Sequence, residues 1–174
     1  MKSAGTIAFV SVLALSAAAT AYAAEPQTSS YFEVGYAAPQ IGFAGYSATP
    51  GNIVARGGFN FTKNFSAEVF GSAGVASGNI NNVTLKLDSA YGAYLKAQAE
   101  LAPHFEFYAR AGWVHATLSS NAVSGTGSDS SFSYGVGAQY LFTKNWYLQG
   151  DYSSYYDKQG VTIKGPAIAV GYRY

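Results

Sequence analysis

Residues 131–157 read SFSYGVGAQYLFTKNWYLQGDYSSYYD, and two runs of alternating side chains in this stretch decide the fold. From Phe132 to Phe142 every second residue is apolar or aromatic, and the residues between them are mostly small or polar. A second run alternates in the same way from Trp146 onward. Because successive side chains of a strand point to opposite faces, the pattern predicts two antiparallel strands joined by a tight turn at residues 143–145.

The same turn occurs at two earlier points of the chain, at intervals of about 40 residues. Residues 61–65 repeat the Phe-Thr-Lys-Asn-aromatic sequence, and residues 101–105 repeat it more loosely. Extending alternation outward from the three turns predicts eight strands. Their expected ranges are 30–38, 53–61, 65–73, 85–101, 105–118, 131–142, 146–157 and 161–174. The remaining connections, 39–52, 74–84 and 119–130, are expected to be long loops because they are rich in Gly, Ser, Asn and Pro.

Residue parity divides the side chains of these strands between two faces. One face collects Phe32, Val34, Tyr36, Phe59, Phe61, Phe65, Ala67, Val69, Tyr91, Ala93, Leu95, Ala97, Ala99, Phe105, Phe107, Ala109, Ala111, Trp113, Ile168, Val170, Tyr172 and Tyr174. The other face collects Glu33, Arg56, Glu68, Lys96, Gln98, Glu100, Glu106, Arg110, Gln139, Gln149, Asp151 and Arg173. Small residues fill the second face between its charges, and aromatic residues gather near the strand ends.

A closed membrane barrel accounts for all of these features. Its apolar face meets lipid, its narrow lumen needs small residues, and its aromatic residues form belts at the two interfaces. A soluble sandwich explains the alternation but neither the small residues nor the aromatic clusters. From Trp146 to Tyr156, ten steps of about 3.3 Å at a tilt near 40° rise about 25 Å, which matches the apolar band of such barrels. The predicted fold is all-β, an eight-stranded antiparallel up-and-down transmembrane β-barrel.

Two positions are expected to disturb this parity. Pro166 cannot donate a hydrogen bond to a neighbouring strand, so it marks a candidate bulge that would reverse the faces of Lys164 and Thr162. The pair Gly57-Gly58 is a second candidate bulge in its own strand.

The first residues read as a secretory signal peptide. Lys2 precedes an apolar run from Ile7 to Ala19 and the small-residue sequence Ala21-Tyr22-Ala23. We therefore predict a signal peptide at residues 1–23 and one barrel domain at residues 24–174. Removing Lys2 leaves nine basic residues against nine acidic ones, so the remaining chain is formally neutral and offers no electrostatic capture of nucleic acid. Cysteine is absent, which excludes disulfides and thiolate metal sites, and no cofactor or metal motif is present.

The charges on the predicted inner face have to pair with one another, because an unpaired charge in a dry interior costs several kcal/mol. The predicted lumen charge network comprises Glu33, Arg56, Glu68, Lys96, Glu100, Glu106, Arg110, Asp151 and Arg173. Such a network would serve either as structural packing or as a gate. Since an eight-stranded barrel is only wide enough for side chains to fill it, we expect a plugged lumen.

The eight alternating strands, the signal peptide and the ending GPAIAVGYRY at residues 165–174 resemble the small outer-membrane β-barrel family, which includes the OmpA transmembrane domain and the opacity-type surface proteins. The terminal aromatic and the alternating residues before it look like that family's assembly signal, here Ile168, Val170, Tyr172 and Tyr174. The resemblance implies a Gram-negative outer membrane, turns in the periplasm and loops outside. The implied partners are outer-membrane lipid, lipopolysaccharide, the barrel-assembly machinery and an unidentified surface ligand.

His115 and Thr117 raise the alternative of a lipid-modifying enzyme. Some small outer-membrane barrels that deacylate lipid A carry a His, a hydroxyl and an acid on the lipid face. His115 and Thr117 share the outward parity. No carboxylate is available to orient the histidine among the outward positions expected on neighbouring strands near that level, which are Leu87, Ser89, Phe132 and Tyr134. We therefore predict no enzyme and no catalytic residue, and we place His115 with Trp113 in the interfacial aromatic belt.

Three function classes remain: a structural or surface-interaction barrel, a narrow pore, and a lipid-modifying enzyme. The first is preferred because the lumen is expected to be filled. The best candidates for surface contacts are Ile41, Phe43 and Tyr46 in the first predicted loop, since aromatic and large apolar side chains supply contact area, although they would equally pack onto the barrel mouth.

Overall fold

The computed structural model describes residues 28–174 except 44–45, 81–82, 121–125 and 159. Regular structure in this part of the chain consists of β-strands. It contains no helix long and apolar enough to cross a membrane. The strands are β1 (Ser29–Ala37), β2 (Gln40–Phe43), β3 (Tyr46–Ala48), β4 (Gly51–Asn60), β5 (Phe65–Ala76), β6 (Gly78–Ile80), β7 (Val83–Ala102), β8 (Phe105–Ser120), β9 (Thr126–Leu141), β10 (Trp146–Lys158) and β11 (Val161–Arg173).

These segments form eight long antiparallel strands that close on themselves. The spatial order runs β1-β4-β5-β7-β8-β9-β10-β11, and β11 pairs again with β1. The short segments continue long strands: β2 continues β1 along β11, β6 continues β5 along β7, and β3 leads into β4. Two of these interruptions contain Pro39 and Pro50, which cannot donate to a ladder. The fold prediction of an eight-stranded closed barrel is confirmed.

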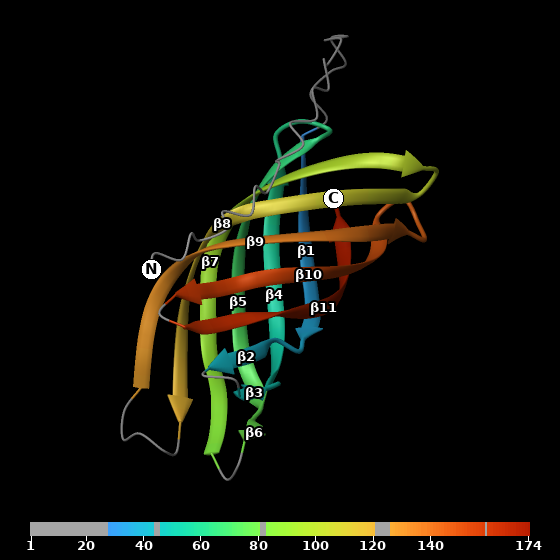
Figure 1. The fold of residues 1–174 in the computed structure, drawn as a ribbon. Helices are drawn as coiled ribbons and strands as arrows, with labels where there is room; N and C mark the ends of the chain where they lie inside the picture. Colours follow the sequence, from blue (N-terminus) through green and yellow to red (C-terminus); the bar gives the residue numbers. More distant parts are fainter. Residues whose placement is uncertain (1–27, 44–45, 81–82, 121–125, 159) are drawn as a thin grey trace, which may run out of the picture.

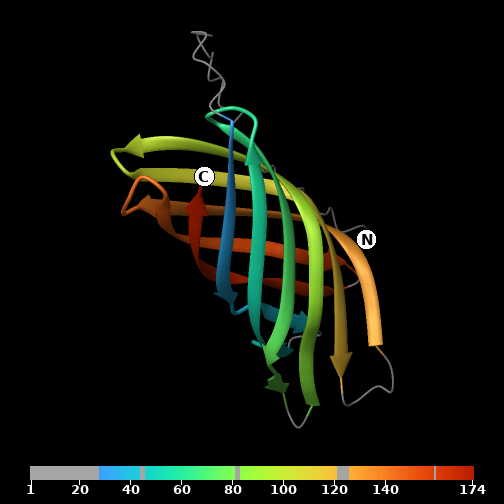
Figure 2. The ribbon, with the colours of Figure 1, turned by 180° about the vertical axis from the view of Figure 1, so that it is seen from behind.

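Figure 1 shows β9, β10 and β11 crossing in front of β1, β4 and β5. Figure 2, seen from behind, shows β1, β4, β5 and β7 on the near side. The two walls cross because the strands of a barrel tilt relative to its axis.

The three tight turns occur where the sequence predicts them, and the two Thr-Lys-Asn copies share one geometry. The hydroxyls of Thr62 and Thr143 accept hydrogen bonds from the N–H groups of Phe65 at 3.0 Å and Trp146 at 2.9 Å. Such local bonds to a hydroxyl favour turns over extended chain. In the third turn His104 has a φ of 68°, the left-handed conformation that histidine tolerates better than bulkier residues.

The alternation of faces holds through both positions that were expected to break it. Pro166 and Lys164 both remain outward, and the register of β4 is continuous through Gly57-Gly58. The bulges lie elsewhere, and one of them falls in β10 between Ser154 and Tyr156, opposite β11. Both expected bulges were wrong. At Pro166 the carbonyl still accepts from Ala38 N–H at 3.0 Å, so only one ladder bond is lost.

The bulge in β10 turns Tyr156, the far end of the expected outer apolar band, into the core at 8% exposure. A second bulge, between Leu87 and Ser89 on β7, overturns another assignment. Leu87 was expected to face outward but is 4% exposed and belongs to the core. The extra residue Asp88 reverses the parity of everything beyond it, as a bulge does.

The predicted long loops are also shorter than expected. Residues 39–52 contain β2, β3 and the start of β4, residues 74–84 contain the end of β5 and all of β6, and residues 126–130 already belong to β9. Gly, Ser and Asn do not exclude strand when neighbouring backbones can satisfy each other's hydrogen bonds. Residues 44–45, 81–82 and 121–125, which fall within these expected loops, lie outside the described residues.

Candidate functional site

Six buried charges from six different strands meet inside the barrel. They are Glu33 on β1, Arg56 on β4, Glu68 on β5, Lys96 on β7, Arg110 on β8 and Asp151 on β10, and each is at most 7% exposed. The strand register brings them together, since Glu33 lies directly opposite Arg56 and Lys96 directly opposite Arg110. We call these six residues the charge ring.

The charge ring is a closed cycle in which acids and bases alternate. Arg56 contacts Glu33 at 3.6 Å and Asp151 at 3.4 Å. Arg110 contacts Asp151 at 3.3 Å and Glu68 at 3.6 Å. Lys96 contacts Glu68 at 3.6 Å and Glu33 at 3.9 Å, which completes the cycle. Every member therefore has two partners of opposite sign, and the three acids balance the three bases.

Hydroxyl and amide donors add hydrogen bonds to two of the ring's carboxylates. The Tyr31 hydroxyl donates to Glu68 at 2.7 Å, and the Tyr147 hydroxyl donates to Glu33 at 2.8 Å. Gln149 Nε2 also donates to Glu33, at 2.6 Å. A buried charge is tolerated only when it is both paired and hydrogen-bonded, so these donors allow the ring to exist in a dry interior.

Glycines on neighbouring strands make room for the tyrosines of this layer. Tyr147 lies directly opposite Gly171, where an added Cβ would come within 2.2 Å of the tyrosine ring. Tyr108 lies opposite Gly137 in the same way, with an added Cβ 2.5 Å from its hydroxyl oxygen. The small residues noticed on the charged face therefore hold space for large neighbours.

Two further members of the predicted network form a second layer toward the turns. Arg173 Nη2 contacts Glu106 Oε2 at 3.1 Å. Gln139 donates to Glu106 and accepts from Lys96 at 3.3 Å, so one amide links this pair to the charge ring.

Glu100 is a correction to the predicted network. Its carboxylate contacts Lys63 at 3.8 Å, with side-chain exposures of 48% and 74% respectively, at the turn end of the barrel. Parity gives the face of a strand residue but not its height, and Glu100 is too close to the turn to reach the interior.

Parity reasoning did not single out the tyrosines that support the ring. Tyr31 and Tyr147 share the inward parity of Glu33 and Gln149, which was the available signal. Above the ring, Phe70 stacks on Tyr155 with ring centroids 5.9 Å apart and meets Tyr94 edge-on at 6.1 Å. These aromatics add a second obstruction toward the loop end.

The four residues of the predicted assembly signal lie at the seam where the barrel closes. Ile168 and Val170 face outward on β11, and Tyr172 packs edge-on against both Trp146 and Tyr174 with ring centroids 5.0 Å apart. The N–H of Tyr174 donates to Ser30 on the neighbouring β1 end at 2.9 Å. The terminal residue therefore touches the first strand of the barrel.

His115 bonds to a hydroxyl but, within the described part of the chain, to no carboxylate. Its Nδ1 lies 2.9 Å from Ser130 Oγ, and its ring lies 5.2 Å from the ring of Tyr91. The described residues also hold no group of three His, Asp or Glu side chains suited to a metal.

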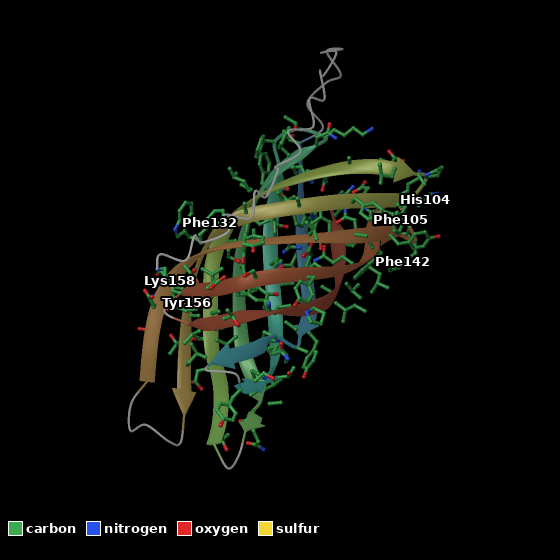
Figure 3. All side chains as sticks on the ribbon, viewed as in Figure 1. His104, Phe105, Phe132, Phe142, Tyr156 and Lys158 are labelled. Atoms are coloured by element: carbon green, nitrogen blue, oxygen red, sulfur yellow. The ribbon has the colours of Figure 1, made fainter. Side chains whose placement is uncertain are left out.

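The outer surface carries aromatics toward both ends of the barrel. Figure 3 shows Phe105 and Phe142 beside His104 at the turn end, and Phe132 toward the opposite end. Half-exposed residues such as Val136, Leu95 and Ile168 lie between the belts. An apolar outer face between two aromatic belts, around a polar interior, defines a transmembrane β-barrel.

Comparison with known proteins identifies the family to which this barrel belongs. The model of the outer membrane protein beta-barrel domain family matches residues 7–174, and the chain belongs to this family. It is an integral outer-membrane protein. No curated protein sequence matches it.

Solved structures of small outer-membrane barrels share the fold. Ail, the attachment invasion locus protein of Yersinia pestis, is 19% identical, with 84% of this chain and 98% of that chain covered and a TM-score of 0.63. The N-terminal barrel of Pseudomonas aeruginosa OprF is 13% identical over 84% and 97% of the chains, with a TM-score of 0.59. Neisserial surface protein A is 16% identical over 83% and 95%, with a TM-score of 0.59.

Proposed function

We propose that this protein is a non-conducting outer-membrane barrel whose interior serves stability and whose biological role lies on its loop-side surface. The closed charge ring is the observation that carries the proposal. A cycle in which every charge already has two partners leaves none free to select an ion or to act on a substrate. Its long side chains also fill the cross-section of a barrel that is narrow at eight strands.

The loop-side surface is larger than a minimal barrel requires. From Trp113 to Ser120, β8 continues for seven residues beyond the aromatic belt, a rise of about 18 Å at about 3.3 Å per residue and a tilt near 40°. β7 and β9 accompany it through paired backbone. A paired extension of this length supports a rigid contact surface above the membrane.

The chemistry of this surface favours an uncharged partner. Ail has been solved with the heparin analogue sucrose octasulfate, a polyanion. Here two loop-side lysines, Lys158 and Lys86, are already paired with Asp129 at 3.7 Å and Asp88 at 3.6 Å. A third, Lys164, shares a groove with Asp157. The segments 44–45, 81–82, 121–125 and 159 contain no charged residue.

Of the three contact candidates in the first loop region, Tyr46 is 55% exposed and stays a candidate. Ile41 is 3% exposed and packs in the core, which corrects its expected role as a contact. The side chain of Phe43 lies outside the described residues.

We further propose that residues 1–23 are a cleaved signal peptide and that the outward pattern ending at Tyr174 is read by the barrel-assembly machinery. The apolar run and the small residues before Glu25 support the first point. The exposed row Ile168, Val170 and Tyr172 supports the second.

Planar-bilayer recording of the purified, refolded protein tests the central proposal. We expect little or no conductance from the unmodified chain. A steady, large single-channel conductance would overturn the plugged barrel and place the pore first. Incubation with lipid A, followed by mass spectrometry of the products, tests the enzymatic alternative, for which we expect no released acyl chain.

A further inference from the structure

Two charged residues of the strands have no ion-pair partner among the described residues. Every other Lys, Arg, Asp and Glu within the described strands has an ion-pair partner. Lys164 on β11 and Asp157 on β10 do not, and both are exposed. Neither is held by an ion pair, so both are free to contact a ligand.

Both unpaired charges line the same groove on the outer face of β9, β10 and β11. The groove has a volume of about 340 Å³. Its walls are Tyr134, Gly135, Val136, Tyr152, Ser154, Asp157, Thr162 and Lys164. The two charges share this space without reaching each other, so a molecule lying between them could contact both.

The groove lies at the membrane boundary on the loop side. Lys164 is eight residues above Tyr172 of the turn-side belt, a rise of about 20 Å at about 3.3 Å per residue and a tilt near 40°. Its lower wall is formed by Val136 and Tyr152, which are 62% and 52% exposed, and Tyr134, which is 55% exposed, lies opposite Ser154. Lipid chains cover that part of a barrel, so the groove begins in hydrocarbon and ends among headgroups.

The polar groups are arranged in a fixed order along the strands. Lys164 lies directly opposite Ser154, and one step higher Thr162 lies opposite Asp157. Moving outward from the apolar wall, a ligand meets first an ammonium with a hydroxyl and then a carboxylate with a hydroxyl. The two levels are two residues apart on β11, roughly 6–7 Å along the strand.

We propose that this groove binds the headgroup of a phosphoethanolamine-type lipid. Its acyl chains would lie along Val136 and Tyr152, its phosphate would contact Lys164 and Ser154, and its terminal amine would contact Asp157 and Thr162. In such a lipid the amine lies beyond the phosphate, which is the order of the charges in the groove. A purely anionic lipid would leave Asp157 facing a negative charge, and a choline headgroup has no N–H to donate to the carboxylate.

Native mass spectrometry of lipids retained by the refolded protein tests the proposal. The protein is reconstituted in vesicles of equal parts phosphatidylethanolamine, phosphatidylcholine and phosphatidylglycerol and then extracted in mild detergent. We expect phosphatidylethanolamine to be enriched over both others, and Lys164→Gln to lower that enrichment roughly two- to fivefold, the range for one exposed ion pair. Asp157→Asn leaves the lysine alone, so we expect it to shift retention toward phosphatidylglycerol.

Two further variants make the result specific. Lys144→Gln removes an exposed lysine from a turn at the opposite end and should leave the enrichment unchanged. The double swap Lys164→Asp with Asp157→Lys keeps both charges but reverses their order, so the enrichment should not return. Heat-dependent gel mobility confirms that each variant is folded. Equal retention of the three lipids by the unmodified protein, or no change in Lys164→Gln, would overturn the proposal.

Discussion

At the scale of single residues, Arg110 is the member of the charge ring whose loss is easiest to interpret. It contacts Glu68 and Asp151 and lies over the Tyr108 ring at 4.8 Å. Arg110→Ala removes bulk from the lumen and takes one partner from each carboxylate. We expect the free energy of unfolding to fall by about 3–5 kcal/mol, as when one partner of a buried pair is removed. We also expect a measurable conductance, and urea titration and planar bilayers report the two effects.

A double variant within the charge ring can be compared with its two single variants. Removing two neighbours together, as in Glu68→Gln with Lys96→Gln, leaves the remaining four charges balanced in pairs. We therefore expect the double variant to lose less stability than the sum of its single variants. Glu100→Ala should change stability by no more than about 0.5 kcal/mol because its pair is exposed. Equal losses in Glu100→Ala and Arg110→Ala would contradict the buried-ring interpretation.

Gly171 gives a second test at this scale. An added Cβ would lie 2.2 Å from the Tyr147 ring, which in turn holds Glu33, so Gly171→Ala should cost about 1–3 kcal/mol through overpacking. Gly150 is the matched control, because the nearest atom to its added Cβ is 4.0 Å away. Urea unfolding of the two variants should separate them by at least about 1 kcal/mol. Identical midpoints would show that the tyrosine has room to move.

The sequence predicted which face each ring charge occupies but not how the charges pair. Period-two alternation holds through the strand segments that carry the ring charges, so the inward set was readable. The cyclic order depends on register and barrel stagger, which bring Lys96 of β7 to Glu33 of β1. Neither can be obtained from alternation within one strand.

At the scale of elements, a deletion at the seam between β11 and β1 should affect assembly and stability to different extents. Deleting Tyr174 removes one exposed aromatic, one backbone hydrogen bond to Ser30 and a ring contact with Tyr172. We expect the unfolding free energy to fall by only about 1 kcal/mol, the usual contribution of one hydrogen bond. The amount of folded protein in the outer membrane should fall much more, because the terminal residue is proposed to be part of the assembly signal.

Quantitative blotting of heat-modifiable protein in membrane fractions measures that effect. Tyr140→Ala, which removes an exposed aromatic from β9 and leaves the terminus intact, is the control and should assemble at the normal level. Normal outer-membrane levels after deletion of Tyr174 would refute the proposed signal.

The elements also show where pattern reading reached its limit. The turns were predictable because their chemistry is local: Thr62 and Thr143 make the same bonds in two copies of one sequence. The bulge at Asp88 was not, since β7 alternates normally on either side and only its pairing with β8 reveals the extra residue. Strand length was underestimated for a related reason, because pairing between neighbours extended strands through Gly- and Ser-rich sequence.

At the scale of the whole molecule, the barrel is asymmetric, and its asymmetry predicts its orientation. At the turn end the strands are joined by three short connections, whereas β7, β8 and β9 extend well past the aromatic belt at the other end. In outer-membrane barrels short turns face the periplasm and long connections face outside. We therefore expect Ser47 and Ser128 outside, and Lys63, His104 and Lys144 in the periplasm.

The absence of cysteine from the chain makes this topology directly measurable. Single substitutions Ser47→Cys and Ser128→Cys are exposed on the loop side, and Lys63→Cys and Lys144→Cys are exposed at the turns. A membrane-impermeant maleimide applied to whole cells should label the first pair and label the second only after the cells are lysed. Labelling of all four in lysate shows that each thiol is reactive. Labelling of Lys63→Cys but not Ser128→Cys in intact cells would invert the barrel and move the lipid groove at Lys164 to the periplasmic leaflet.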